Sequence, residues 1–182
     1  MKNKEIIING SGFTIRPYRK SDFISLVENA NNEKIARDFI TVSINRYNKK
    51  EAEKFIAQSI AKNDSENSTG NFVIEINSLA VGVISGNIKK DKPFTFIFGY
   101  WLGEKYWNRG IISKVVKLYT KYLFNKLKNL QRIEATVFLW NEASKKVLEN
   151  NNFKLEGILR KNHQYRGKII DEYIFSKLRN ER

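Results

Sequence analysis

Hydrophobic and polar residues follow two different periods along this chain, and the two periods alternate. Apolar residues that alternate with polar ones, or that form short continuous runs, predict strands over residues 13–17, 71–77, 79–88, 94–102, 132–140, 153–159 and 168–178. Apolar residues at helical spacing predict helices over residues 21–30, 48–62, 110–128 and 142–150, with Ser21 and Asn48 placed to cap the first two.

The strand at 94–102, FTFIFGYWL, is apolar at successive positions, so we expect both of its faces to be buried in the middle of a sheet. Gly99 inside this strand predicts a bulge or a close approach by another group. The chain contains no linker, repeat or low-complexity tract that would divide it. The pattern therefore predicts one domain over residues 1–182, of the α/β (α+β) class, with a mixed, mostly antiparallel central sheet flanked by helices.

Composition narrows the chemistry. The chain has 182 residues and a hydrophobic fraction of 41%, which is enough for a sizeable core. It has no cysteine and one histidine, which excludes disulfides and a thiol nucleophile and argues against a Cys/His metal site. No apolar run has the length of a membrane span or a signal-peptide core. We expect a cytoplasmic protein that binds no metal and does not contact a membrane.

The charge of the chain points to an acidic partner. The formal net charge is +14, and residues 113–132 contain six Lys or Arg and no Asp or Glu. Nucleic acid, the ribosome, a membrane surface and a phosphorylated cofactor all suit this excess, and so does a basic surface with no specific partner. Charge alone does not choose among them.

The turn before the third predicted helix offers a more specific anion site. No glycine run is followed by Lys-Ser or Lys-Thr, and the Gly10-Ser11-Gly12 segment precedes a strand, so neither common phosphate loop is present. Instead, Asn108-Arg109-Gly110 follows the central strand and opens directly into a basic helix. Free backbone N–H groups at such a helix start can hold a pyrophosphate, assisted by the helix dipole.

The residues around this turn resemble a known family. YWLGEKYWNRGIIS, followed by NEASKKVLENNNF and LEGILR, is similar to the GNAT superfamily of acetyl-CoA-dependent N-acetyltransferases, and to its RimJ/RimL-like branch in particular. The likeness extends from FTIRPYRKSD to GKIIDEYIFSKL, nearly the whole chain. It implies acetyl-CoA as cosubstrate, a pyrophosphate held by the turn, and a bulged strand, ending at Leu102, that splays from its neighbour to admit the pantetheine arm. The implied cofactor-binding residues are Leu102, Asn108, Arg109, Gly110, Ile111, Ile112, Ser113, Asn141 and Lys146.

Several positions depart from the superfamily pattern. Trp107 and Ile112 replace residues usual in the pyrophosphate loop, and backbone donors tolerate such changes. Leu148 stands where many members carry a tyrosine acid, so the resemblance to the RimJ/RimL-like branch leaves Ser144 as the candidate hydroxyl that supports the departing thiolate. Asn152 occupies a position that is usually glycine, and asparagine accepts the left-handed conformation that such a turn needs.

The implied reaction is direct attack of a neutral amine on the thioester, because the chain has no cysteine for an acyl-enzyme. The strand position where many relatives carry a carboxylate is Ile97. His163, the only histidine, aligns roughly with a cleft glutamate of some RimL-like relatives and is our candidate base, directly or through water. An exposed histidine without a catalytic role is the equally weighted alternative.

Three functions remain open at this stage. The acceptor can be a protein N-terminus, such as that of a ribosomal protein that the basic chain approaches through RNA. It can be a small amine such as a polyamine or an aminoglycoside, or the chain can be a non-catalytic coenzyme A or RNA-binding module. Cationic small amines favour carboxylates in the cleft, and the closing segment offers few beyond Asp171 and Glu172. We therefore favour the protein N-terminus, with the enzyme a monomer or a homodimer.

Overall fold

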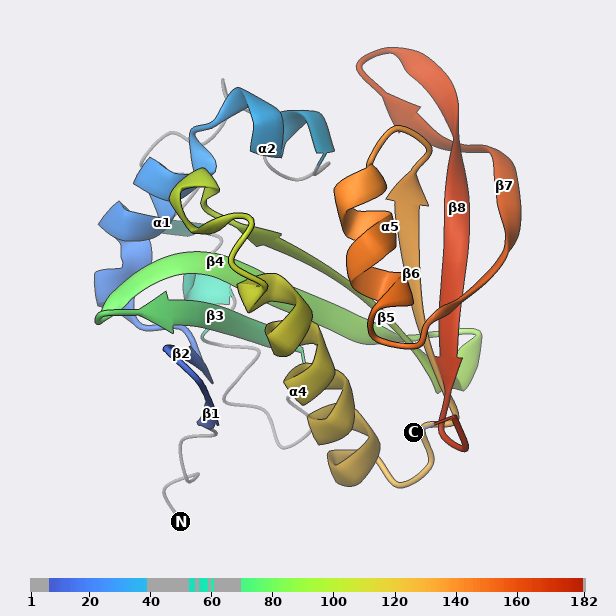
Figure 1. Cartoon of the computed structure of the whole chain (residues 1–182), viewed down its shortest axis with the longest axis horizontal. Helices are drawn as coiled ribbons and strands as arrows, with labels where there is room; N and C mark the ends of the chain where they lie inside the picture. The colour runs from blue at the N-terminus through green and yellow to red at the C-terminus, as the bar shows by residue number, and fades with distance from the viewer. Residues whose placement is uncertain (1–6, 39–52, 55, 59, 61–69, 182) are drawn as a thin grey trace.

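One eight-stranded sheet forms the centre of the protein, in the order β1-β2-β3-β4-β5-β6-β8-β7 (Figure 1). The structure is a computed structural model that describes residues 7–38, 53–54, 56–58, 60 and 70–181. All neighbouring strands pair antiparallel except β5 and β6, which are parallel. The strands are β1 (Ile8–Gly10), β2 (Phe13–Arg16), β3 (Asn71–Ile76), β4 (Leu79–Lys89), β5 (Lys92–Leu102), β6 (Arg132–Phe138), β7 (Lys154–Tyr165) and β8 (Lys168–Leu178).

Helices cover both faces of the sheet and enclose two hydrophobic cores. Phe72 and Ile74 of β3 belong to one core, whereas Val73 between them belongs to the other, as the alternation of side chains along a strand requires. The first core is shared with α4 (Ile111–Lys126) and α5 (Glu142–Glu149), and the second with α1 (Phe23–Ala30) and α2 (Glu33–Asp38). Among the described helices, none combines the length and the apolar character needed to cross a membrane.

The strand pattern was predicted well, and the central position of β5 is confirmed. The turn between β3 and β4 contains Asn77 and Ser78, both at positive φ (50° and 62°), which joins the two strands as a tight hairpin as expected. The short β1 and α2 were not predicted. The helix predicted over residues 48–62 lies largely outside the described residues.

One local prediction was wrong, and one of the two alternatives predicted for Gly99 is excluded. Ser21 does not cap α1: it lies in a 3-10 turn (Lys20–Asp22), and α1 begins after Asp22, whose buried carboxylate pairs with Arg16 at 2.7 Å. The bulge at Gly99 is absent. The residues of β5 from Phe96 to Leu102 pair one-to-one with β4, including Gly99 with Ser85, so the strand runs through the glycine without an extra residue.

Strands β5 and β6 pair at one end and diverge along the rest of their length, as the resemblance implied. Their pairing covers only Thr95–Ile97 with Arg132–Glu134. Beyond this point β5 stays with β4 as far as Leu102, and β6 stays with β8 as far as Phe138. Figure 1 shows β6, β8 and β7 turning away from the direction of β3, β4 and β5. The gap opens between two strands that each keep their other neighbour.

Candidate functional site

Two cavities lie where β5 and β6 separate. The larger has a volume of about 550 Å³ and is bounded by the end of β5, the turn before α4, the start of α5 and α2. The smaller, about 200 Å³, lies between the diverging parts of β5 and β6. Four residues line both cavities, namely Asp38, Tyr100, Asn141 and Ser144. The two spaces therefore meet at the start of α5.

The smaller cavity passes between the strands rather than lying on one face of the sheet. Its wall includes Tyr100 and Leu148, which lie on the side of α5, and also Ile97 and Gly99, which alternate with Tyr100 along β5 and so point to the opposite face. The opening thus connects the α4/α5 side of the molecule with the other side of the sheet. Gly99 lines this opening.

The first turn of α4 forms one wall of the larger cavity. Gly110 is the N-cap residue at φ 67°, Asn108 lies at φ 59°, and no side chain caps the helix start. The first N–H groups of a helix have no intrahelical partner, and here they carry the positive end of the helix dipole. A Cβ atom built on Gly110 meets nothing within 4 Å, so the approach to these donors is open.

Trp107 explains why the turn tolerates an unusual first residue. Its indole Nε1 donates a hydrogen bond of 2.6 Å to the carbonyl oxygen of Leu102, the last residue of β5. The guanidinium of Arg109 lies 5.8 Å from the ring centre of Tyr106. These contacts fix the turn to the end of β5. The position of the backbone N–H groups relative to the gap between β5 and β6 is therefore set by side chains that do not themselves need to bind an anion.

The start of α5 supplies polar side chains at the junction of the cavities. Asn141 is the N-cap, with Oδ1 accepting from the Ser144 N–H at 3.0 Å, which leaves its amide NH₂ without a partner in the described part of the chain. The Tyr100 hydroxyl donates to the Ser144 carbonyl at 3.3 Å. Burial raises the pKa of Tyr100, because the phenolate would be poorly solvated there, so this hydroxyl stays protonated. Tyr100 packs against the first core and, like Trp101, lines the larger cavity.

Most of the cofactor residues suggested by the sequence converge on the larger cavity. Arg109 lies in the same turn but is outside the cavity wall. Leu148 of α5 is fully buried, and it supplies no hydroxyl at that position. Asn152 has φ 61°, as its place in the turn predicted. Of the site residues suggested by the sequence, those that line the larger cavity are Leu102, Asn108, Gly110, Ile111, Ile112, Ser113, Asn141, Ser144 and Lys146.

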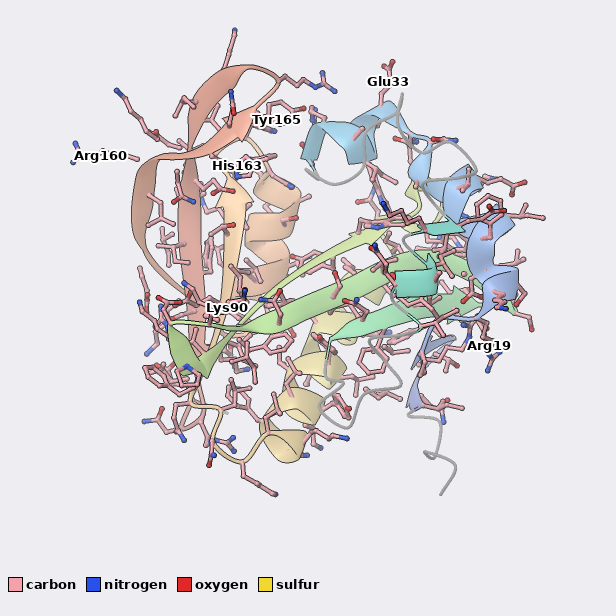
Figure 2. The ribbon with its side chains drawn as sticks, turned by 180° about the vertical axis from the view of Figure 1, so that it is seen from behind. Arg19, Glu33, Lys90, Arg160, His163 and Tyr165 are labelled. Atoms are coloured by element: carbon pink, nitrogen blue, oxygen red, sulfur yellow. The ribbon has the colours of Figure 1, made fainter. Side chains whose placement is uncertain are left out.

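His163 lies beside the smaller cavity but not in its wall. Its ring centre is 6.0 Å from that of Phe138, which does line the cavity. Figure 2 shows His163 and Tyr165 near the end of β6, whereas Arg160 on the same strand points away from the sheet. The catalytic role of His163 stays a prediction.

Two acidic residues line the smaller cavity: Glu172, which the sequence offered only as one of the few carboxylates of the closing segment, and Asp38, which sequence reasoning missed. Glu172 of β8 is only 2% exposed, lines the cavity, and accepts a hydrogen bond of 2.6 Å from the Asn162 amide at Oε2. Asp38 at the end of α2 pairs with Arg37 at 2.8 Å and accepts from the Trp140 indole at 3.1 Å. A charged residue at an inward position of an apolar strand was a usable signal for Glu172. No sequence pattern marked Asp38.

Comparison with known sequences agrees with this geometry. Residues 13–154 match the family model described as an acetyltransferase (GNAT) domain. An uncharacterized N-acetyltransferase of Bacillus licheniformis is 42% identical over 83 residues, which cover 46% of each protein. The probable N-acetyltransferase YjcK of Bacillus subtilis is 34% identical over 117 residues, 64% of each. The matches thus span less than half of the first relative and less than two thirds of the second.

Solved structures share the fold over nearly the whole chain. The ribosomal α-N-protein acetyltransferase RimL, in complex with coenzyme A, superposes with a TM-score of 0.82 at 19% identity, covering 97% of this chain and 100% of that chain. The microcin self-immunity acetyltransferase MccE, in complex with acetyl-CoA and AMP, gives a TM-score of 0.81 at 23% identity and covers 93% of both. At such identities the likeness establishes the architecture, and the acceptor must be argued from the site.

Proposed function

The chain belongs to the GNAT acetyltransferase family, and from this premise we propose that it transfers the acetyl group of acetyl-CoA to a primary amine, with a protein N-terminal α-amine as the favoured acceptor. The observation that carries the proposal is the uncapped start of α4, which opens into a cavity of about 550 Å³ that continues into the gap between β5 and β6. This arrangement suits a long ligand with an anionic middle and a reactive end.

The residues present fit acetyl-CoA. The N–H groups of Ile111, Ile112 and Ser113 are in place to bind its pyrophosphate, and Lys146 lies in the same cavity wall as a further cation. Beyond Ile97, the backbone of β5 has no strand partner on its β6 side. Such an unpaired strand edge can hydrogen-bond an extended amide-containing chain, which is the chemical character of a pantetheine arm.

Acetyl-CoA supplies an acetyl thioester, and the side chains at the cavity junction manage charge and protons. The Ser144 hydroxyl lines both cavities and, in the proposal, donates to the sulfur as negative charge develops on it. The Asn141 amide, held by its capping bond to Ser144, adds a second donor. His163 is the base suggested by the sequence, and it reaches the acceptor directly or through water.

An α-amine suits such a site because little base catalysis is needed. With a pKa of about 8, roughly a tenth of N-terminal amines are neutral at pH 7, whereas a lysine side chain is neutral in about one molecule in two thousand. The net charge of +14 favours approach to an acidic assembly such as ribosomal RNA. Ribosome association is thus part of the proposal, with salt sensitivity as its expected mark.

A small cationic amine is the second candidate acceptor. The observation in its favour is that two carboxylates, Asp38 and Glu172, line the smaller cavity. Asp38 is already engaged by Arg37 and Trp140, which leaves one carboxylate to attract a cation. This arrangement supports a single ammonium better than a polyamine.

The test is release of free thiol from acetyl-CoA by the purified protein, with peptides that begin with Ala or Ser, polyamines and aminoglycosides as acceptors. Turnover on peptides, and none on peptides whose N-terminus is already acetylated, is the expected result. Turnover restricted to small amines makes the second candidate correct. Acetyl-CoA binding without turnover on any of these acceptors contradicts the proposed transferase function and favours a non-catalytic coenzyme A-binding module.

A further inference from the structure

Glu172 is a buried carboxylate that the proposed reaction, as described so far, does not use. It sits on β8 opposite Phe138 of β6, at the far end of the strand pair that lines the gap. Its side chain is almost completely buried, yet it forms part of a cavity wall. Burying an unpaired carboxylate costs on the order of several kcal/mol. A buried carboxylate with few hydrogen-bond partners is therefore expected to bind a ligand.

The hydrogen bonds of Glu172 are incomplete. Asn162 Nδ2 donates to Oε2 at 2.6 Å, and no donor in the described part of the chain reaches Oε1. No lysine or arginine lines the smaller cavity. A carboxylate accepts several hydrogen bonds, and an ammonium group is a donor of three. The open oxygen and the open cavity therefore match one ammonium group.

We propose that Glu172, in place of His163, the base suggested by the sequence, binds the acceptor ammonium on the sheet face opposite α5 and takes its proton before attack. This proposal rests on the proposed function. Because facing residues of paired strands point the same way, Glu172 shares its face with Phe138 and not with Leu148 or Ser144. The cofactor reaches the gap from the α4 side in the proposal above, so the acceptor amine meets the thioester from the Glu172 side.

Among the carboxylates around Glu172 in the described part of the chain, the others are already paired, so Glu172 is the one available to accept a hydrogen bond from the acceptor. Asp38 from α2 is held by Arg37 and Trp140, and Tyr100 from β5 donates to a backbone carbonyl. His163 of β7 packs against Phe138 on the same side. Glu134, four residues earlier on β6, lies on the same face but is paired with Lys89 and Arg132. With one free carboxylate, the described part of the site selects acceptors with a single ammonium.

The step balances as follows. The acceptor ammonium gives one proton to Oε1 of Glu172, and the resulting neutral amine forms the new N–C bond with the thioester carbon as the C–S bond breaks. The second amine proton ends on the departing sulfur. Glu172 then returns its proton to solvent, so that acetyl-CoA and ammonium give an amide, free thiol and one proton.

The test compares Glu172→Gln with Asp171→Asn, which makes the same charge change one residue away. Asp171 bonds only the Lys161 backbone N–H in the described structure, at 2.8 Å, and lines neither cavity. For Glu172→Gln we expect kcat/KM on an Ala-starting peptide to fall by about 100-fold at pH 7. The deficit should shrink above about pH 9, where the amine is already neutral in solution. Asp171→Asn should behave as the natural protein, and acetyl-CoA affinity should be unchanged in both.

Peptide binding gives a second readout that does not need turnover. We expect the Ala-starting peptide to bind the coenzyme A complex at least about tenfold more weakly in Glu172→Gln, because a charge-assisted hydrogen bond is lost. The same peptide with an acetylated N-terminus should not distinguish the two proteins. If the natural protein binds the free amine through Glu172 but releases no thiol, the transferase function fails and the ammonium site stands.

Three results would overturn the inference. One is a Glu172→Gln protein that matches Asp171→Asn in turnover and peptide binding. Another is a deficit that is the same at every pH, since a purely structural role predicts it. The third is loss of the acidic limb of the pH profile in His163→Gln with Glu172→Gln unaffected.

If Glu172→Gln does not fold, Glu172→Asp keeps the charge and withdraws the carboxylate by one methylene. It should lose at least about tenfold in kcat/KM, because small misplacements of a reacting group are costly. Natural activity in that variant equally rejects the role.

Discussion

The two ends of the β5–β6 pair have opposite characters. At the closed end, three residue pairs from Thr95–Arg132 to Ile97–Glu134 are hydrogen-bonded, and ion pairs surround them. At the open end the same two strands form no hydrogen-bonded ladder, and the two cavities lie there instead. One strand pair therefore provides both a fixed junction and an opening, and the junction sets how far apart the walls of the opening stand.

The closed end is held by a network of charges on the face opposite α5. Glu134, which is 5% exposed, accepts from Arg132 at 2.6 Å and from Lys89 at 3.0 Å. Arg132 also pairs with Glu156 of β7, with one bond of 2.7 Å. Burial by itself would raise the pKa of Glu134, but the hydrogen bonds from Arg132 and Lys89 outweigh it and lower that pKa. The network joins β4, β6 and β7 around the point where the strands begin to part.

At the open end, β5 and β6 are kept apart by α5 and by the pairing of each strand with its other neighbour. Leu148 is fully buried under the gap, and the Tyr100 hydroxyl is bonded to the α5 backbone. Filling the gap with strand hydrogen bonds would require β6 to leave β8. Substitutions at the closed end should therefore act on stability, and substitutions at the open end on binding and turnover.

The largest effect should follow from Gly110→Asp at the open end. A carboxylate at the start of α4 opposes the anion that the helix is placed to bind, so we expect acetyl-CoA affinity to fall by at least 100-fold, or about 3 kcal/mol. Gly110→Ala is the matched control: its Cβ meets nothing, and the positive φ costs only about 1–2 kcal/mol of stability. Calorimetric titration with acetyl-CoA measures both. Equal affinities for the aspartate and alanine variants would move the pyrophosphate elsewhere.

Glu134→Gln tests the closed end. It leaves the Lys89 and Arg132 charges partly unpaired beside a buried amide, and we expect a loss of about 2–3 kcal/mol in the free energy of unfolding. Denaturant unfolding monitors this loss, and acetyl-CoA affinity should be retained. A variant of natural stability with impaired cofactor binding would reverse the division between the two ends.

Ser144→Ala should separate binding from turnover within the open end. Removing one hydroxyl aimed at developing charge is expected to lower kcat by about 10- to 100-fold, while the dissociation constant for acetyl-CoA stays nearly constant. The capping bond is unaffected, because it uses the backbone N–H of Ser144. Steady-state kinetics beside calorimetry decide the point, and an undiminished kcat would assign the supporting hydroxyl to another group, Tyr100 being the nearest.

The smallest effect concerns acid stability at the closed end. Hydrogen bonding from Arg132 lowers the pKa of Glu156 to about 2, whereas an unfolded glutamate titrates near pH 4.3. A depressed folded pKa contributes stability above the unfolded value, and the contribution is lost as the pH falls through about 2. Because Glu156 is 40% exposed, the gain is less than about 1 kcal/mol. Glu156→Gln should melt slightly lower than the natural protein at pH 7, and the two melting curves should converge near pH 2. Parallel curves at all pH values would remove Glu156 from the acid response.

The sequence alone determined the features that depend on neighbours along the chain. The apolar run of β5, the glycine turn opening α4, and the positive φ of Asn152 follow from periodicity and from which residues accept a left-handed backbone. The family resemblance rested on these same local features and their spacing. The Ser21 cap was wrong because α1 begins after Asp22, whose carboxylate pairs with Arg16 six residues earlier.

Tertiary structure alone decided which polar groups share a cavity. Asp38, Tyr100, Ser144 and Glu172 come from four separate elements, and their meeting depends on strand register and on where β5 and β6 part. A shift of one residue in register would turn Glu172 to the other face of the sheet, and no local pattern records that register. The anion site could be predicted because consecutive backbone atoms build it, whereas the acceptor side could not, because it exists only once distant strands have paired.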